Sequence, residues 1–204
     1  FDHFSGIAGL ASQFDIGQVI INDQFERLAA ESPAAKDFLA MLKKRNIPVQ
    51  ITSGRHELEG LGEFHLESIW PPPQSEWKAQ LPNDSSTVLR LEYQGHSILL
   101  TADIAEAAMA QLLPLGEIKA DVLALAHHGS VVGNTSEFIK AVDPKIAVRS
   151  TAQPRRLTTN EIERIVGKRG YLTTADDGCV LIQIRDGRLT ARATSTRKVL
   201  SWPK

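Results

Sequence analysis

The 204-residue sequence lacks several features that would assign it to a particular class of protein. Its single cysteine, Cys179, excludes an internal disulfide and a cysteine-rich zinc site. No apolar run approaches the roughly 20 residues that a membrane-spanning helix requires. The formal net charge of −1 supplies no overall field that would attract nucleic acid or an anionic membrane. Neither a signal peptide nor a methionine stands at the start, so we expect a soluble piece of a longer protein.

What is present is the length and composition of one globular domain. Hydrophobic residues make up 42% of the chain and charged residues 23%, which is ordinary for a chain that buries a sizeable core. Helices are predicted over 3–14, 32–46, 104–113, 135–142 and 158–169. Strands are predicted over 17–22, 48–53, 64–69, 86–93, 96–103, 121–126, 145–150, 170–174, 179–184 and 188–195. Because hairpins interrupt the strand–helix alternation, the pattern favours a layered α/β or α/β/β/α arrangement over a purely parallel sheet.

Polar side chains follow two of the predicted strands. Asp103 ends the strand 96–103, and His127 and His128 follow the strand 121–126. In layered α/β folds the groups at the carboxyl ends of strands converge at one rim of the sheet. One site could therefore collect all three side chains, and imidazole with carboxylate is a ligand set for zinc or manganese.

Each of these residues also has a plainer interpretation. Asp is a preferred N-cap residue, so Asp103 could instead cap the helix 104–113. The two histidines could be a hydrogen-bonded loop pair; in a functional site, one would face a metal and the other would serve as second ligand, proton donor or phosphate contact. Three further histidines are interpreted as surface residues: His56, His65 and His96.

Four stretches carry a resemblance to a known family and keep its order along the chain. They are "FDHFSGIAGL" at the start, "DSSTVLRLEYQGHSILLTADI", "VLALAHHGS" and "LTTADDGCVLI". The chain resembles the metallo-β-lactamase fold superfamily and, more narrowly, the soluble domain of DNA-uptake competence proteins of the ComEC type. The resemblance implies one domain over 1–204, a four-layer αββα sandwich without its N-terminal strands and without the first half of its metal loop.

The resemblance also implies a site for two divalent metal ions, zinc or manganese, whose bound hydroxide attacks the substrate. The implied metal ligands are Asp2, His3, Asp103, His127 and His128. Among these, Asp103 would bridge the two ions, and His128 is either a ligand or the general acid or base. The implied catalytic residues are Asp2 and His128.

Candidate substrate contacts come from two sources. The resemblance implies that Ser130 and the loop with Asn83 line the substrate side. The sequence itself offers Arg155 and Arg156, because an arginine pair after a strand can hold phosphate through bidentate hydrogen bonds. The alternative for this pair is two solvated arginines on a loop.

The sequence departs from the family pattern at several points. "TAD" replaces "TGD" and "AHHG" replaces "GHHG", so Ala102 and Ala126 stand where the family has glycine, which can adopt backbone shapes that alanine avoids. The leading residues of the first metal motif are absent, and "STAQPRRLTTNE" lacks the histidine that the family often has after the strand 145–150.

The favoured function is a metal-dependent hydrolase, a phosphodiesterase or nuclease that acts on DNA and is related to competence. Nucleic acid is then the substrate, and the resemblance implies a membrane channel as partner and a bacterial cytoplasmic or membrane-associated domain. One alternative is a hydrolase of a small ester, thioester or lactam, since a fold does not fix a substrate. Another is a non-catalytic binding module with a decayed metal site.

Overall fold

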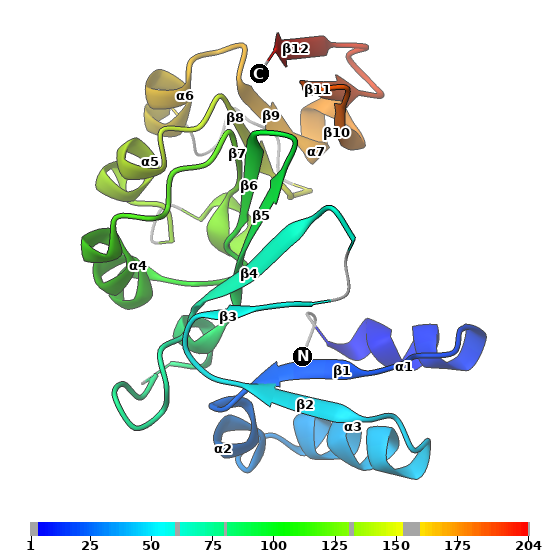
Figure 1. The fold of residues 1–204 in the computed structure, drawn as a ribbon. Helices are drawn as coiled ribbons and strands as arrows, with labels where there is room; N and C mark the ends of the chain where they lie inside the picture. Colours follow the sequence, from blue (N-terminus) through cyan, green and yellow to red (C-terminus); the bar gives the residue numbers. More distant parts are fainter. Residues whose placement is uncertain (1–3, 60–61, 80, 131–132, 153–159, 204) are drawn as a thin grey trace.

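The computed structural model describes residues 4–59, 62–79, 81–130, 133–152 and 160–203. Within these residues the largest sheet has seven strands, in the order β3-β4-β5-β6-β7-β8-β9 (Figure 1). They are β3 (His56–Glu57), β4 (His65–Trp70), β5 (Val88–Tyr93), β6 (His96–Leu100), β7 (Val122–Ala124), β8 (Ile146–Arg149) and β9 (Tyr171–Thr173).

The pairing of neighbouring strands changes once across this sheet, from antiparallel to parallel. Neighbouring strands from β3 to β6 are antiparallel, and β5 and β6 form the expected hairpin. From β6 to β9 the strands are parallel: Val122 pairs with Ile98 on one side and with Ile146 on the other. The carboxyl ends of β6, β7 and β8 therefore lie along one edge of the sheet, which we call the rim.

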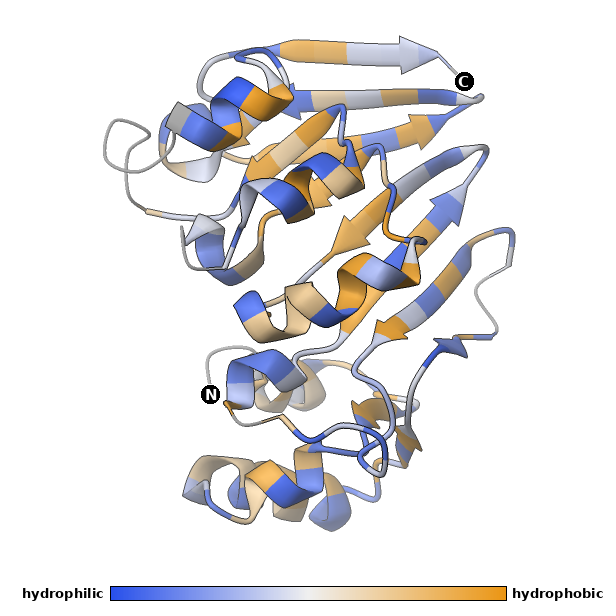
Figure 2. Cartoon of the chain, turned by 90° about the vertical axis from the view of Figure 1, so that its left-hand side faces the viewer, coloured by the Kyte–Doolittle hydropathy of each residue, from blue (hydrophilic) through white to orange (hydrophobic). Residues whose placement is uncertain are grey.

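Helices cover one face of the large sheet (Figure 2). They are α4 (Glu106–Leu112), α5 (Ser136–Val142) and α6 (Asn160–Val166). Their apolar sides and the sheet share a core with fully buried Leu99, Met109 and Phe138. Burying a side chain of this size stabilises the fold by about 1.5–3 kcal/mol, so this core holds the parallel strands in place.

A second sheet lies on the other face of the large sheet. Its strands are β10 (Val180–Arg185), β11 (Arg188–Ala193) and β12 (Val199–Pro203), all antiparallel. Leu189 and Ala191 point inward and pack with Val122 and Ile146 of the large sheet. The hairpin of β10 and β11 was predicted from the sequence, whereas β12 was not.

The N-terminal part forms a third core around a parallel pair of strands. Its elements are α1 (Ser5–Gln13), β1 (Val19–Asn22), α2 (Phe25–Ala29), α3 (Pro33–Lys44) and β2 (Val49–Thr52). Phe38 and Leu42 of α3 pack with the strand residues Val19 and Ile21. The side chain of Ser32 accepts a hydrogen bond from the Ala35 N–H at 3.3 Å, which confirms it as the N-cap of α3.

Short helical turns complete the described chain. They are η1 (Pro82–Ser85), η2 (Leu113–Leu115), η3 (Ala126–Gly129) and α7 (Thr174–Asp177). The layered α/β class predicted from the sequence is confirmed, with helices on one face of a mixed sheet and strands on the other. None of the helices in the described residues is long and apolar enough to span a membrane.

One sequence-based expectation and one alternative interpretation are wrong. His96 is buried, not a surface residue: its ring contacts Asp121 Oδ2 at 3.2 Å and the Gly187 carbonyl at 3.1 Å, and so links β6 to the second sheet. The N-cap residue of α4 is Ala105, not Asp103, and the Asp84 carboxylate accepts hydrogen bonds from the Ala105 and Ala108 N–H groups at the start of this helix. Alternation and helix capping are local sequence patterns, whereas the contacts of His96 and Asp84 join segments that are distant in sequence.

Asp177 ties the end of β9 to the turn between β11 and β12. Its buried carboxylate accepts hydrogen bonds from the Thr173 N–H at 3.0 Å and the Thr196 hydroxyl at 2.9 Å, and it pairs with Lys198 at 3.0 Å. Burial alone would raise the pKa of this carboxyl, but the hydrogen bonds from Thr173, Lys198 and Thr196 together hold its pKa below the ordinary value. The late "LTTADDG" stretch thus has a structural role.

We expect Asp177→Asn to lower the free energy of unfolding at pH 7 by about 2 kcal/mol, because it removes the buried anion from this network. A lowered folded-state pKa means that the carboxylate stabilises the fold above its unfolded-state pKa of about 3.9, and that this contribution is lost as the pH falls through the folded-state value. The difference between wild type and variant should therefore shrink below about pH 4. Urea unfolding across pH measures it, and a difference that is constant into acid would contradict the assignment.

Candidate metal centre

The loops that follow β6 and β7 are joined at the rim. The His127 N–H donates to the Ala102 carbonyl at 3.0 Å. Just beneath, the buried hydroxyl of Thr101 donates to the Ala124 carbonyl at 2.6 Å. These two hydrogen bonds continue the parallel pairing of β6 with β7 beyond the ends of the strands. They hold the loop with Asp103 beside the loop with the two histidines.

Left-handed backbone is concentrated in these loops. Ala102 has φ +46°, His127 +48° and His128 +55°, and Gly129 follows with +75°. For a residue with a Cβ atom this conformation costs roughly 1–2 kcal/mol. Such conformations persist where surrounding contacts impose them, and they gather at functional sites. The cost is therefore offset by the contacts that hold the loop.

Asn134 supplies the contacts that hold the histidine loop. Its buried side chain accepts from the Ala126 N–H at 3.0 Å and donates to the Ala126 carbonyl at 2.7 Å and the Ser130 carbonyl at 2.8 Å. The helix that follows is capped by Thr135, whose hydroxyl accepts from the Phe138 N–H at 3.2 Å. Thr135 is therefore the N-cap of this helix, and Asn134 holds both ends of the histidine loop.

The His128 ring is oriented by a neighbouring strand. Its Nδ1 lies 3.1 Å from the carbonyl oxygen of Ser150, just after β8. A carbonyl oxygen can only accept, so Nδ1 carries the hydrogen, and the neutral ring presents the lone pair of Nε2. That nitrogen lies 4.0 Å from Oδ1 of Asp103. The side chain of His128 is 52% exposed and that of Asp103 13%, so solvent reaches the pair mainly from the histidine side.

This pair has the donor chemistry of a shared divalent ion. Zinc bonds imidazole nitrogen and carboxylate oxygen at about 2.0–2.2 Å in a tetrahedral arrangement, which places two donors of one ion about 3.4 Å apart. His128 and Asp103 are 4.0 Å apart, so a small approach of the two side chains would let them share one ion. A hydrogen bond from the far ring nitrogen to a carbonyl is also how metal-binding histidines are commonly oriented.

The described residues supply two of the expected ligands in mutual reach, and not a complete set. No group of three His, Cys, Asp or Glu side chains that could hold a metal occurs among them. The His127 ring centroid lies 6.5 Å from that of His128, at an interplanar angle of 65°. Asp2 and His3, the ligands expected from the first motif, lie outside the described residues. The predicted five-ligand set therefore stays a prediction.

The expected substrate contacts are only partly brought to the rim. Ser130 ends the histidine loop, and its N–H donates to the His127 carbonyl at 3.0 Å. Asn83 lies in η1, next to the Asp84 that caps α4. Arg155 and Arg156 lie outside the described residues.

Arg149 is a residue of the site that sequence reasoning missed. It ends β8, is buried, and donates from Nε to the His128 carbonyl at 3.0 Å. Its side chain passes so close to Gly129 that a Cβ atom there would lie 2.6 Å from the Arg149 Cγ. The signal in the sequence was an arginine at the end of an otherwise apolar strand, where a solvated residue is the usual expectation.

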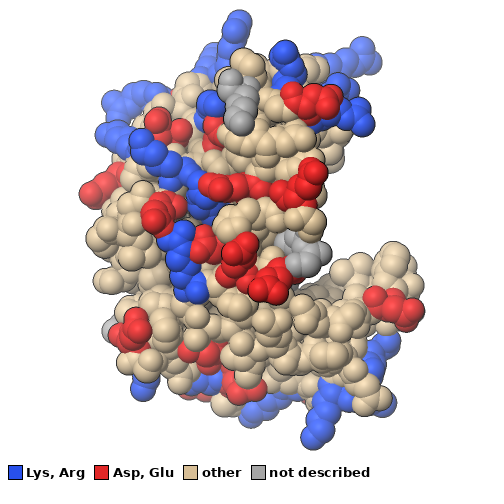
Figure 3. Space-filling model, in the orientation of Figure 1, with Lys and Arg blue, Asp and Glu red and all other residues tan. Residues whose placement is uncertain are grey.

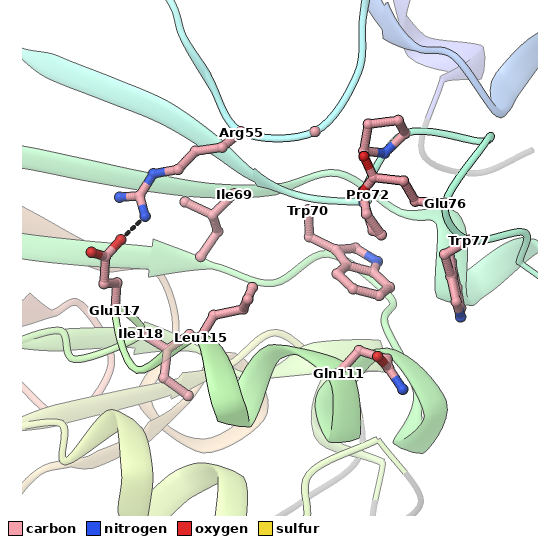
Figure 4. A pocket seen from close by; sticks show the side chains of 12 residues that line it. Arg55, Ile69, Trp70, Pro72, Glu76, Trp77, Gln111, Leu115, Glu117 and Ile118 are labelled. Carbon is pink, nitrogen blue, oxygen red and sulfur yellow. Dashed lines mark ion pairs between the residues drawn. The ribbon is translucent and has the colours of Figure 1, made fainter.

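A cavity of about 530 Å³ lies elsewhere in the molecule (Figure 4). Trp70 and Trp77 line it with ring centroids 4.7 Å apart, and Arg55 and Glu117 form an ion pair at its side. None of the residues expected in the metal centre lines this cavity, so it is separate from the rim.

A layered α/β fold that brings imidazole and carboxylate side chains to one rim can hold a divalent metal ion there. A family model described as the metallo-beta-lactamase superfamily matches residues 1–153. The chain belongs to the metallo-beta-lactamase superfamily, and the resemblance found in its motifs is confirmed.

The chain is also similar in sequence to parts of three individual proteins. The chain is 36% identical over 96 residues to ComE operon protein 3 of Bacillus subtilis (strain 168), covering 46% of this chain and 12% of the relative. It is 30% identical over 119 residues to competence protein ComA of Neisseria gonorrhoeae, covering 56% and 17%. It is also 30% identical over 112 residues to the uncharacterized protein YcaI of Escherichia coli (strain K12), covering 53% and 14%. The aligned part thus spans less than a fifth of each relative.

Replacing Ala102 or Ala126 by the glycine that the family has there should change the free energy of unfolding in opposite directions. Ala102 is left-handed, so Ala102→Gly should raise the free energy of unfolding by about 0.5–1 kcal/mol. Ala126 is fully buried and has no positive φ, so Ala126→Gly should lower it by about 1 kcal/mol or more. Urea unfolding of both variants measures the pair, and equal effects would contradict the backbone assignment.

Proposed function

We propose that this chain is the hydrolytic domain of a DNA-uptake protein and that it hydrolyses phosphodiester bonds of DNA with the aid of divalent metal. The observation that carries the proposal is the arrangement of His128 and Asp103: an imidazole with a fixed tautomer faces a carboxylate across 4.0 Å at the rim. Membership of the superfamily supports hydrolysis in general. The competence relatives support DNA as the substrate.

In this proposal the residues of the chain bind the metal ion and orient the side chains that bind it. His128 and Asp103 would bind the metal, together with His127 and with Asp2 and His3 from the first motif. When bound, a divalent ion supplies a Lewis acid and lowers the pKa of water. The contact with the Ser150 carbonyl leaves Nε2 of His128 available as a metal ligand, and the hydrogen bond from Arg149 holds the His128 backbone in place. The half-exposed His128 lies on the side from which a substrate phosphate could approach.

The proposal is tested with single substitutions in the intact protein. Asp103→Ala and His128→Ala should each reduce Mn²⁺-dependent cleavage of a labelled DNA strand by about 100-fold or more, because loss of a ligand weakens metal binding at least as much as loss of a residue that orients one. Cleavage rates with and without Mn²⁺, and metal content by elemental analysis, are the measurements. His65→Ala is the matched control, since His65 is a partly exposed histidine paired with Glu57, outside the rim.

Near-normal cleavage by either rim variant that still unfolds cooperatively would contradict the site. Bound metal without DNA cleavage, but with turnover of a small ester, thioester or lactam, would replace DNA by the second substrate class. An intact protein that binds less than one ion per chain and cleaves nothing would instead be a binding module with a decayed site.

A further inference from the structure

The outer face of the second sheet is rich in arginine. Along β11, Leu189 and Ala191 are buried against the large sheet, so Arg188, Thr190 and Arg192 alternate with them and point outward. All of β10, β11 and β12 belongs to the described residues. The alternation therefore places a row of polar and basic side chains on the side of the sheet that faces away from the core.

Strand register gathers the basic side chains into one surface. Arg185 of β10 is the direct cross-strand partner of Arg188, so the two guanidinium groups start from adjacent backbone positions. Arg192 lies four residues further along β11, about 13 Å away at the usual rise of 3.3 Å per residue. A shallow depression of about 240 Å³ is lined by Gln183, Arg185, Asp186, Arg188, Thr190 and Arg192. We call Arg185, Arg188 and Arg192 the arginine face.

The arginine face carries more positive than negative charge, since Asp186 is the one acidic residue among those that line the depression. No ion pair joins its three arginines to a carboxylate in the described part of the chain; Arg188 donates to the Ser201 hydroxyl at 3.3 Å. Elsewhere the pattern differs: Arg55 pairs with Glu67 and Glu117, and Lys145 pairs with Asp121. Figure 3 shows basic side chains at the end of the molecule where the second sheet lies, with acidic side chains beside them, and further basic side chains at the opposite end.

The face also has a geometric connection to the rim. The turn between β11 and β12 is fastened through Asp177 to the end of β9. Thr174, which begins α7, exchanges hydrogen bonds of 2.8 Å with the backbone of Thr151 just beyond β8. The Arg192 end of the face therefore lies toward the rim, and the Arg185 and Arg188 end lies away from it.

We propose that the arginine face binds the phosphate backbone of the DNA strand that the rim acts on, an inference that rests on the proposed function. Arginine forms paired hydrogen bonds with phosphate oxygens, and its planar group suits such contacts better than lysine. One strand of DNA carries a charge about every 3.4 Å of helix axis, so the 13 Å span faces several successive phosphates. Ser201 adds a neutral hydroxyl donor beside the arginines, whereas the Thr190 hydroxyl already donates to the Gln183 carbonyl. The face offers no contact to the bases, so we expect binding to be independent of sequence.

The test compares two triple variants of the intact protein. Arg185→Gln, Arg188→Gln and Arg192→Gln are combined in one protein. The control combines Lys140→Gln, Lys168→Gln and Arg169→Gln, exposed residues on the helical side with the same change in charge. Anisotropy of a labelled single-stranded oligonucleotide is titrated in EDTA from 50 to 200 mM NaCl, so the rim metal does not contribute. These salt concentrations bracket the range over which phosphate contacts are weakened strongly.

We expect the arginine-face variant to bind DNA about 10-fold or more weakly at the lowest salt, with a salt slope reduced by about 2, since each phosphate contact to a single strand contributes about 0.7. The control should keep the wild-type slope. Equal slopes for both triple variants would overturn the proposal, as would unchanged DNA binding together with lost binding to phosphatidylglycerol vesicles, which would make the face a lipid contact.

The outcomes separate this inference from the proposed function. If the intact protein cleaves DNA normally and the arginine-face variant binds and cleaves like wild type, the inference fails and the function stands. If no cleavage occurs under any condition but the variant loses salt-dependent DNA binding, the function fails and the binding face stands.

Discussion

The parallel pairing of β6 with β7 and of β7 with β8 is the constraint on which the candidate site depends. It brings the carboxyl ends of three strands to one edge, and the bond from the His127 N–H to the Ala102 carbonyl carries the pairing into the loops. This alignment brings Asp103 and His128 close together although they are 25 positions apart in sequence. The helices on one face and the second sheet on the other bury the apolar sides that keep these strands in register.

The rim is stabilised by its surroundings more than by its own backbone. Ala102, His127 and His128 all adopt left-handed conformations that residues with a Cβ atom avoid. Asn134 and Arg149 offset this cost by satisfying carbonyl and N–H groups of the same loop. Because these supporting side chains are buried, the half-exposed ring of His128 can contact solvent or a ligand without losing its orientation.

Much of the fold was predictable because apolar periodicity records which side of each element is buried. The hairpin around Gly95, the capped helix beginning after Ser32 and the polar ends of β6 and β7 all follow from local patterns. Contacts between distant segments were not predictable: alternation alone gave no sign that His96 would be buried against Asp121 and Gly187. For the candidate site, the sequence identified the residue types at the strand ends, whereas only the fold selects His128 as the ring that faces Asp103.

The proposed site depends on one divalent ion that is held jointly by Asp103 and His128. Crystals of the intact protein grown with Mn²⁺ or Zn²⁺, with diffraction measured on both sides of the metal absorption edge, locate that ion directly. Joint binding predicts an anomalous peak within about 2.0–2.3 Å of an Asp103 carboxylate oxygen and of Nε2 of His128. A peak bound by other residues, or none at the rim while both side chains contact only water, would contradict it.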